Sequence, residues 1–205
     1  MPYAADHVAE TRRRIVESAR RLFNRKGFNE VSIDEIMAGA GLTRGGFYHH
    51  FKTKDELYAE AISIALTCDP VARISGKPAD PNQSADALMR RLIEAYLSRQ
   101  HLEKTEEHCA LFALPSDVAR ASPTVRTAYQ NVLSAMAGLF ERGLGNEAAA
   151  RQKALALAAL CVGGMTLANT VADPALAEEI RASALASALD LLPEPLTREL
   201  RRVGS

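Results

Sequence analysis

Residues 44–49 combine a cation, two adjacent glycines and aromatic and imidazole groups, and this combination could contact a nucleic acid. Gly45 and Gly46 each cost a helix interior about 1 kcal/mol relative to alanine, and no stability argument requires two of them. Residues that weaken a helix without stabilising the fold in another way are expected at a functional site. A helix N-terminus with free N–H groups, a cation such as Arg44 and no bulk suits a phosphate or the floor of a DNA groove.

A short helix that would precede this segment is predicted by the residues from Ser32 onward. Ser32 can cap the helix, and Glu35 three residues later completes a capping box. Apolar side chains follow at helical spacing, namely Ile33, Ile36 and Met37. Gly41 can take the positive φ that a helix end or a tight turn needs. A helix-turn-helix over residues 32–51 is therefore expected.

The second helix of this motif would begin at Thr43, whose hydroxyl can act as its N-cap. Phe47 and Phe51 lie four residues apart, so they are expected to face inward together. The outward face then carries Arg44, Tyr48 and His49.

Different roles are expected for these outward side chains. Arg44 is the candidate for reading guanine, because an arginine can donate two hydrogen bonds to one guanine edge. Tyr48, His49 and Lys54 are assigned to the phosphate backbone. The full set of candidate DNA-binding residues is Ser32, Thr43, Arg44, Gly45, Gly46, Tyr48, His49 and Lys54.

Helices are expected on both sides of the motif. Apolar residues mark one face of a helix over about residues 9–25, and the residues before it show no periodicity and are expected to be mobile. Three arginines at 12–14 would oppose the dipole of that helix at its start, so either a neighbouring phosphate backbone or ordinary solubility accounts for them. Thr53 and Glu56 form a second capping box that opens a helix to about residue 67.

Charge is balanced over the chain but not along it. The 25 basic and 25 acidic residues argue against a nonspecific nucleic-acid coat protein. Residues 11–54 hold 10 basic and 4 acidic residues, a balance of +6, which leaves −6 for the rest. A basic module on an acidic body favours a phosphate-seeking end, and the alternative is a solvated charged face.

Several short motifs follow one another in a recognisable order and spacing. They are an apolar first helix, Gly27-Phe28, Ser32 with Glu35 and Ile36, Ala40 to Thr43, Gly46 with Tyr48, His50 and Phe51, and Lys54 with Glu56 and Leu57. Over roughly residues 11–60 the chain thereby resembles the TetR family of one-component transcriptional regulators. The resemblance implies a helix-turn-helix DNA-binding domain at residues 1–52 and a helical ligand-binding and dimerisation domain at residues 53–205.

Composition predicts an all-α protein. Hydrophobic residues make up 47% of the chain, which suffices for a real core. Tryptophan is absent and aromatics are 5%, while alanine and leucine dominate the second half, which favours close-packed helices over a sandwich or barrel. Three scattered cysteines and an N-terminus without an apolar signal segment lead us to expect a cytoplasmic protein.

The body is expected to hold a turn-rich segment at residues 75–84 and helices at about 85–99, 109–119, 124–142, 147–171 and 175–192. Residues 154–172 form an apolar run interrupted by glycine and polar residues. This run is a marginal membrane span, and a buried helix at a subunit contact is favoured over a membrane partner.

Small residues in the last two helices permit close helix approach, either within one subunit or between two. These residues are Ala154, Ala158, Gly163, Ala168, Ala182, Ala186 and Ala188. The family resemblance implies that the two helices form a four-helix bundle with those of a second subunit.

Larger apolar side chains on the intervening helices are core residues first. The resemblance implies that they also line a chamber for a small-molecule effector, whose identity no residue reveals. The candidate ligand-binding residues are Met89, Leu92, Tyr96, Phe112, Tyr129, Met136, Phe140 and Met165.

Residues 101–109 concentrate groups that could ligate a metal, but their spacing matches no closed zinc site or facial triad. Cys109 beside His108 raises nucleophilic catalysis, yet no orienting third group and no glycine-rich oxyanion loop accompany them. No metal, cofactor or catalytic residue is therefore assigned, and the protein is not expected to be an enzyme.

Together these features predict a homodimeric repressor that binds an inverted-repeat operator in double-stranded DNA and is released by a small, largely apolar ligand. The sign of the coupling stays open, so activation is an alternative. A second alternative is a helical enzyme or small-molecule carrier that uses the body cavity without DNA regulation.

Overall fold

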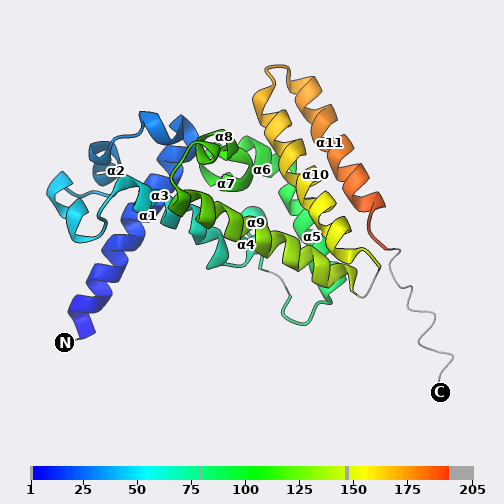
Figure 1. Ribbon diagram of the computed structural model, residues 1–205, viewed down its shortest axis with the longest axis horizontal. Coiled ribbons are helices and arrows are strands. Elements are labelled where there is room, and N and C mark those ends of the chain that lie inside the picture. The colour runs from blue at the N-terminus through cyan, green and yellow to red at the C-terminus, as the bar shows by residue number, and fades with distance from the viewer. Residues whose placement is uncertain (1, 79, 146–147, 194–205) are drawn as a thin grey trace.

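Helix-forming residues dominate the chain, and the computed structural model describes residues 2–78, 80–145 and 148–193 as helices and their connections, with no strand in these ranges. The expected all-α class is confirmed. The first helices lie at one end of the molecule, and the long helices α10 (Ala150–Thr170) and α11 (Pro174–Asp190) lie side by side at the other (Figure 1).

The N-terminal part follows the predicted helix-turn-helix. Its elements are α1 (Pro2–Glu30), α2 (Ile33–Gly39), the 3-10 helix η1 (Arg44–His49), α3 (Lys54–Ser63) and the 3-10 helix η2 (Ile64–Leu66). The motif predicted at residues 32–51 is α2 with η1, and the helix predicted to run to about residue 67 is α3 with η2.

The first helix begins earlier than predicted. It starts at Pro2, and the expectation of an irregular segment before residue 9 is wrong. Residues 6–10 are all exposed, so no apolar stripe marks this part of the helix in the sequence. The arginines at 12–14 consequently lie about three turns inside α1, where the argument from the helix dipole does not apply. Gly27, with a φ of 77°, breaks the helix where a break was predicted.

The body is more segmented than predicted. The helix expected at 85–99 is two, because Leu97 leaves helical geometry and Ser98 caps a new helix by accepting from the His101 N–H. The helix expected near 109–119 is split before Pro115. The elements are α4 (Pro70–Ser75), α5 (Ala85–Tyr96), α6 (Arg99–Glu103), η3 (Thr105–Glu107), α7 (Ala110–Ala113), α8 (Pro115–Ala119) and α9 (Pro123–Leu144). Residue 147, the predicted start of the next helix, lies outside the described residues.

Helix α3 joins the two parts, because it packs on α1 and on α9. Its Tyr58 is fully buried, with ring centroids 4.8 Å from Phe23 and 4.6 Å from Phe28. Its Leu57 and Ile62 belong to the same buried cluster as the side chains of the body. A boundary between residues 52 and 53 therefore remains a prediction, and α3 has neighbours on both sides of it.

Helix α10 is, among the described residues, the one helix long and apolar enough to cross a membrane. It packs against α9, α11 and α7 and buries Leu157, Cys161 and Met165 completely. A core helix of a soluble protein meets the same test, so the length and composition of α10 are weak support for a membrane span.

Candidate nucleic-acid interface and body cavity

The predicted capping box at the start of α2 is present in full. The Ser32 Oγ accepts from the Glu35 N–H at 3.1 Å, and the Ser32 N–H donates to Glu35 Oε2 at 3.1 Å. The Lys26 ammonium, 2.6 Å from Glu35 Oε1, and the Ser32 N–H lower the pKa of Glu35 to about 2. Gly41 has a φ of 69°, as its place in the turn required. Local signals therefore position α2.

The second element of the motif differs from prediction in two respects. Residues 44–49 form a 3-10 helix, and Thr43 stands at the N-cap position without a hydrogen bond from its side chain, so the predicted side-chain cap is wrong. The Gly46 N–H donates to the Thr43 carbonyl at 3.0 Å, which closes the first tight turn by backbone alone. Phe47 and Phe51 are buried with ring centroids 5.7 Å apart, as predicted.

The outer face of η1 is open. Arg44, Gly45, Tyr48 and His49 are exposed, and Tyr48 keeps 61% of its surface despite its large ring. A Cβ added at Gly45 would meet no described atom within 4 Å, whereas one at Gly46 would meet Met37 Cε at 3.4 Å. Folding therefore does not require a glycine at position 45, and this favours the close approach of another molecule.

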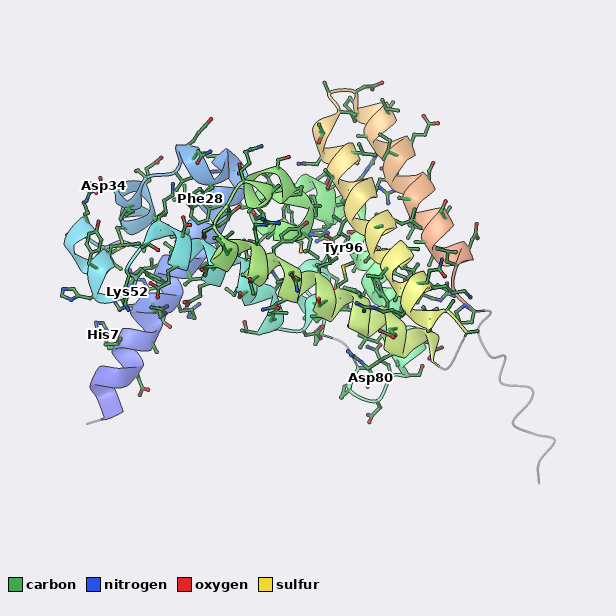
Figure 2. The ribbon with its side chains drawn as sticks, in the orientation of Figure 1. His7, Phe28, Asp34, Lys52, Asp80 and Tyr96 are labelled. Atoms are coloured by element: carbon green, nitrogen blue, oxygen red, sulfur yellow. The ribbon has the colours of Figure 1, made fainter. Side chains whose placement is uncertain are left out.

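Arg44, the candidate base reader, has a partner within the protein. Its Nη1 lies 2.7 Å from Asp34 Oδ2, and both side chains are more than half exposed. Asp34 stands at the same end of the molecule as Lys52 (Figure 2). An exposed pair of this kind contributes about 0–1 kcal/mol to stability, so its main effect is to hold the guanidinium in one place.

Arg12 fastens η1 to the rest of the domain, a role that sequence reasoning missed. It donates from Nε to Glu60 Oε1 at 3.0 Å and from Nη2 to the second oxygen of the same carboxylate. Its Nη1 donates to the His50 carbonyl at the end of η1, and its guanidinium lies 4.0 Å from the centroid of the Phe51 ring. Arg12 thus joins α1, η1 and α3 at one point.

The neighbouring arginines are also engaged within the molecule. Arg13 pairs with Glu10 at 2.7 Å on the exposed face of α1, and Arg14 donates to the Ala40 carbonyl at the end of α2. The sequence left two explanations open for these arginines, a neighbouring phosphate backbone and ordinary solubility. The contacts favour a third, because Arg12 and Arg14 hold η1 and α2 in position.

Lys54, a candidate phosphate contact, is half-buried. Its ammonium donates to the Phe28 carbonyl and lies 4.2 Å from the centroid of the Phe28 ring. Burial lowers the pKa of Lys54, and the charges of Asp55 and Glu35 oppose that effect. Two N–H donors of an ammonium remain beyond the bond to Phe28, so a phosphate contact stays a prediction. Thr53 caps α3 as predicted, but Glu56 accepts from the Lys52 N–H instead of completing the box on Thr53.

A cavity of about 220 Å³ opens in the body between the end of α3, α4, α5 and α9. Most of its wall is apolar, from Ala65, Leu66, Pro70, Ile74, Leu92, Leu111, Val132, Ala135, Met136 and Leu139. Its polar groups come from Cys68, Arg73, Tyr96, His101, Glu107, Cys109 and Arg142. Figure 2 places Tyr96 in the interior of the body, away from the labelled residues of the DNA-binding end. We call this space the chamber.

Three of the eight predicted ligand-binding residues line the chamber, namely Leu92, Tyr96 and Met136. The other five do not line it. Met89, Phe112, Phe140 and Met165 are buried core residues, and the Tyr129 hydroxyl donates to the Leu111 carbonyl at 2.6 Å. Of the polar lining groups, sequence reasoning assigned only Tyr96 to the chamber. His101, Glu107 and Cys109 stood in the segment noted for its possible metal ligands, and Cys68, Arg73 and Arg142 were missed as lining groups.

The imidazole of His101 has a defined protonation state in the chamber wall. Its Nδ1 lies 2.8 Å from the Tyr96 carbonyl, which can only accept, so Nδ1 carries the proton. Burial lowers the pKa of His101 to about 4, so the ring is neutral at pH 7 and Nε2 is a bare acceptor. Neither His101 Nε2 nor Tyr96 Oη has a hydrogen-bond partner among the described residues.

Cys109 and His108 do not form a catalytic pair. Burial raises the pKa of the Cys109 thiol, which disfavours the nucleophilic thiolate. His108 Nε2 lies 2.9 Å from the Leu102 carbonyl, so the imidazole donates there and is not directed by a carboxylate. Over the described ranges, no group of three or more His, Cys, Asp or Glu side chains is arranged to hold a metal ion.

Two connections lead from the chamber to the DNA-binding end. The first is direct, because Ala65 and Leu66 line the chamber and continue α3. The second passes through η3: Glu107 lines the chamber and lies 3.2 Å from the buried Arg20 of α1. Arg20 also donates to the Glu106 carbonyl at 2.6 Å, and Asn24 donates to the His108 carbonyl at 2.8 Å.

A groove of about 630 Å³ runs along α10 and α11 at the far end. Its rim carries two exposed leucines, Leu167 and Leu176, and its wall contains Gly163. The small residues singled out in these helices divide in two. Ala154, Ala158, Ala168 and Ala188 are buried within the subunit, whereas Ala182 and Ala186 are exposed.

An N-terminal helix-turn-helix with an open outer face, joined through one helix to an all-helical body with a chamber, is an architecture found in helix-turn-helix transcription regulators. The sequence matches the family described as bacterial regulatory proteins, tetR family, over residues 15–61. This match and the named relatives support membership of the TetR family for the N-terminal part of the chain, as the order of its motifs suggested.

The relatives are named as regulators rather than enzymes. The HTH-type transcriptional regulator AcrR of Shigella flexneri is 47% identical over 51 residues, 25% of this chain and 24% of that protein. The HTH-type transcriptional regulator TtgR of Pseudomonas putida is 35% identical over 91 residues, 43% of this chain and 41% of that protein. The matched segment thus spans well under half the length of these relatives.

Solved structures share the fold along almost the whole chain. The reduced form of E. coli NemR superposes with a TM-score of 0.74 at 18% identity, covering 92% of this chain and 100% of that one. SCO4454, a TetR-family transcriptional regulator from Streptomyces coelicolor, superposes with a TM-score of 0.64 at 23% identity, covering 91% and 97%. At these identities the likeness extends to the fold alone.

Proposed function

We propose that this chain is a homodimeric, sequence-specific DNA-binding transcription regulator, a repressor that a small molecule releases from its operator. One observation carries the DNA-binding role. The open space around Gly45 lies between exposed Arg44 and Tyr48, on an element that Arg12 fastens from behind. A rigid support behind an uncrowded, polar reading face is what the major groove requires.

The proposed dimer follows from the size of η1. Six residues can contact only a few base pairs, so a twofold pair of reading elements about 34 Å apart is needed to span successive major grooves. The groove along α10 and α11, with its exposed leucines, is the surface we assign to the partner subunit as a four-helix bundle. The operator is then an inverted repeat, and the regulator works in the cytoplasm like other soluble members of the family.

Selection of bound duplexes from a random pool tests this proposal with the full chain. Enrichment of one inverted repeat whose half-sites are centred about one helical turn apart is expected. Binding without an enriched sequence, or enrichment of a single unrepeated site, would sink the idea. Analytical ultracentrifugation of the protein with the selected site measures the ratio, which should be two chains to one duplex.

Release is proposed to start in the chamber. A ligand changes operator affinity only if it binds one arrangement of the two reading elements better than the other. Ala65 and Leu66 of η2, which continues α3, and Glu107 beside Arg20 bring chamber-lining atoms to both connections with the DNA-binding end. A route through α3 and η2 has this direct contact in its favour, and η3 adds a second route.

The size of the proposed coupling can be measured. About 1–3 kcal/mol suffices for a 5- to 150-fold loss of operator affinity, and by linkage the operator must weaken the ligand by the same factor. A compound screen by thermal shift, followed by titration of each hit against the protein–operator complex, measures both factors. Hits that stabilise the free protein and leave operator affinity unchanged would make the chamber structural; hits that tighten it would indicate an activator.

The competing function is a small-molecule carrier or enzyme that uses the chamber alone. Only the presence of the cavity favours it. A carrier would keep its function when η1 is damaged, so the variant Gly45→Leu distinguishes the two: a regulator loses control of its promoter, whereas a carrier retains its ligand and its role.

A further inference from the structure

The chamber wall contains two guanidinium groups that form no ion pair with a carboxylate of the described residues. Arg73 on α4 and Arg142 on α9 both line it. Neither forms an ion pair within 4.0 Å with any carboxylate in the part of the chain that the structure describes. Glu107, the acidic residue in the lining, pairs with Arg20 at 3.2 Å, and Glu141 next to Arg142 pairs with Arg151 at 3.4 Å.

This arrangement differs from that of most other arginines in the molecule. Arg12, Arg20 and Arg44 are each paired with a carboxylate, although all three lie in the basic segment, residues 11–54. The chamber thus combines a mostly apolar wall with an excess of positive charge. A cation beside an apolar cavity without a carboxylate partner suits an anionic group on an apolar ligand.

The charge of Arg73 reaches the inner part of the chamber. Burial is the main cause of the lowered pKa of His101, and the positive charge of Arg73 adds to it. Burial also raises the pKa of the Cys109 thiol, and the same guanidinium opposes that rise. Arg73, His101 and Cys109 line the same cavity, so the guanidinium faces the space that these two groups border.

The remaining polar groups determine how an anion would lie. Tyr96 lines the chamber with its ring, because its Oη is fully buried and faces Cys109. His101 Nε2 is a bare acceptor, so a carboxylate placed against it would set lone pair against lone pair. The acid group is then directed to Arg73, and the part of the ligand near His101 must be apolar or carry a hydroxyl donor.

We propose, on the footing of the effector site proposed above, that the chamber takes a small apolar monocarboxylic acid whose carboxylate is held by Arg73, with Arg142 contributing charge at the mouth. The volume of about 220 Å³ limits the ligand to on the order of ten non-hydrogen atoms at interior packing density.

Matched acids and amides test the proposal directly. Benzoate, octanoate and 1-naphthoate are titrated into the full chain beside benzamide, octanamide and 1-naphthamide, with binding measured by calorimetry and thermal shift. At least one acid is expected to bind about tenfold more tightly than its amide, because only the acid gains the charge-assisted hydrogen bonds. Equal affinities within each pair, or binding by neither series, overturn the proposal.

Variants then locate the carboxylate. Arg73→Met should reduce the preference for acid over amide to about twofold, and Arg142→Met should reduce it by a smaller factor. Arg126, an exposed arginine on α9 outside the chamber, provides the matched control Arg126→Met, which should keep the full preference. Thermal unfolding without ligand shows whether each variant folds. If both chamber variants kept the full preference for acid over amide, the assignment of the carboxylate to Arg73 would be wrong.

Operator titration separates this proposal from the proposed function. If acids bind and operator affinity stays unchanged, the acid site stands and release by ligand fails. If a neutral compound releases the operator while no acid binds, the regulator stands and the acid site fails.

Discussion

The two ends of the molecule use arginine in different ways. In the DNA-binding end Arg12, Arg20 and Arg44 each have a carboxylate partner within 3.2 Å, and Arg14 donates to a carbonyl. In the chamber Arg73 and Arg142 have no carboxylate partner among the described residues. The basic segment, residues 11–54, therefore devotes much of its charge to positioning its own elements. The acidic body, with a balance of −6, has two guanidiniums without a carboxylate partner around a cavity.

This difference shows that local charge balance is a poor guide to where a ligand binds. Residues 11–54 carry a balance of +6, yet their pairing leaves few free guanidiniums on the reading face. The specificity of that face must then come from shape and a few hydrogen bonds at η1, with general attraction from the summed charge. The chamber, in contrast, depends on single unpaired groups.

The largest effect is expected at Gly45. Gly45→Leu should abolish operator binding, a loss of more than about 100-fold. The leucine side chain would fill the open space beside η1 that the DNA must occupy when η1 lies in its groove. Thermal stability should stay unchanged, since no described atom lies within 4 Å of the added Cβ. Gel-shift titration and thermal unfolding measure the two quantities.

Gly46→Leu is the informative companion, because its Cβ would stand 3.4 Å from Met37 Cε. It should lose both binding and some stability. Operator affinity near that of the unmodified protein in Gly45→Leu would show that η1 does not enter the groove, and the role given to this end of the molecule would be wrong.

Arg12→Ala should have the next largest effect, and it tests whether arginine in this half positions structure. Removing the contacts to Glu60, the His50 carbonyl and the Phe51 ring should lower the free energy of unfolding by about 1–3 kcal/mol. Urea unfolding measures this loss. Affinity should fall for all DNA sequences while the salt dependence stays the same, because Arg12 is not a phosphate contact here. A weaker dependence of DNA affinity on salt in Arg12→Ala would show instead that Arg12 contacts a phosphate.

Arg44 and Lys54 sharpen the distinction between base and backbone contacts. Arg44→Ala should cost about 1–3 kcal/mol on the preferred site and relax specificity at one base pair. Lys54→Ala should weaken all sequences nearly alike, flatten the salt slope, and also lower stability because it removes the contacts to Phe28. Binding of a panel of operator variants at several salt concentrations tests both; identical loss of specificity in the two would refute the division of roles.

The parts of the fold that the sequence predicted are those with local causes. The capping box of Ser32 and the positive φ of Gly27 and Gly41 depend on neighbours within a few residues, and all three are confirmed. Arg12 with Glu60 depends on a contact across 48 residues, which no spacing rule reveals. The 3-10 geometry of η1 was missed because two glycines and a short apolar pair are compatible with either kind of helix.

The chamber was harder to predict for a related reason. Helical spacing shows which side chains are buried but not which of them border a void, so Phe112 and Phe140 are core residues while Tyr96 lines the cavity. Arg73 lies on the six-residue helix α4, and the sequence predicted no element between about residue 67 and the turn-rich segment at residues 75–84. A lining group of this kind becomes visible only when separate helices are brought together.

The response of the body to pH should be moderate and should distinguish it from the DNA-binding end. An unfolded His101 takes up a proton near its ordinary pKa of 6.5, whereas in the folded protein its pKa is lowered to about 4. Stability is therefore full above pH 6.5 and is lost as pH falls towards 4, by up to about 3 kcal/mol at 1.4 kcal/mol per unit.

Urea unfolding at pH 7 and pH 5 measures this loss, which should be smaller in His101→Gln. The exposed His49 is the matched control, and His49→Gln should lose as much stability as the unmodified protein. The buried His108, whose pKa burial also lowers, accounts for the part of the loss that His101→Gln keeps. Equal losses in all three proteins would mean that His101 is not the group that titrates.

The smallest effect is expected from oxidation of the thiols. Peroxide attacks the thiolate, and burial raises the pKa of Cys161 to about 12 and that of Cys109 above its usual value, so both remain thiols at pH 7. Cys68 is exposed, but it lies at the chamber rather than on the reading face. Mild peroxide should thus change operator affinity by less than about twofold, and replacement of all three cysteines by serine should leave it unchanged. A larger loss, reversible by dithiothreitol and absent in Cys68→Ser, would show that the protein senses oxidants through the Cys68 thiol. The chamber would then respond to oxidation as well as to a ligand bound by its cations.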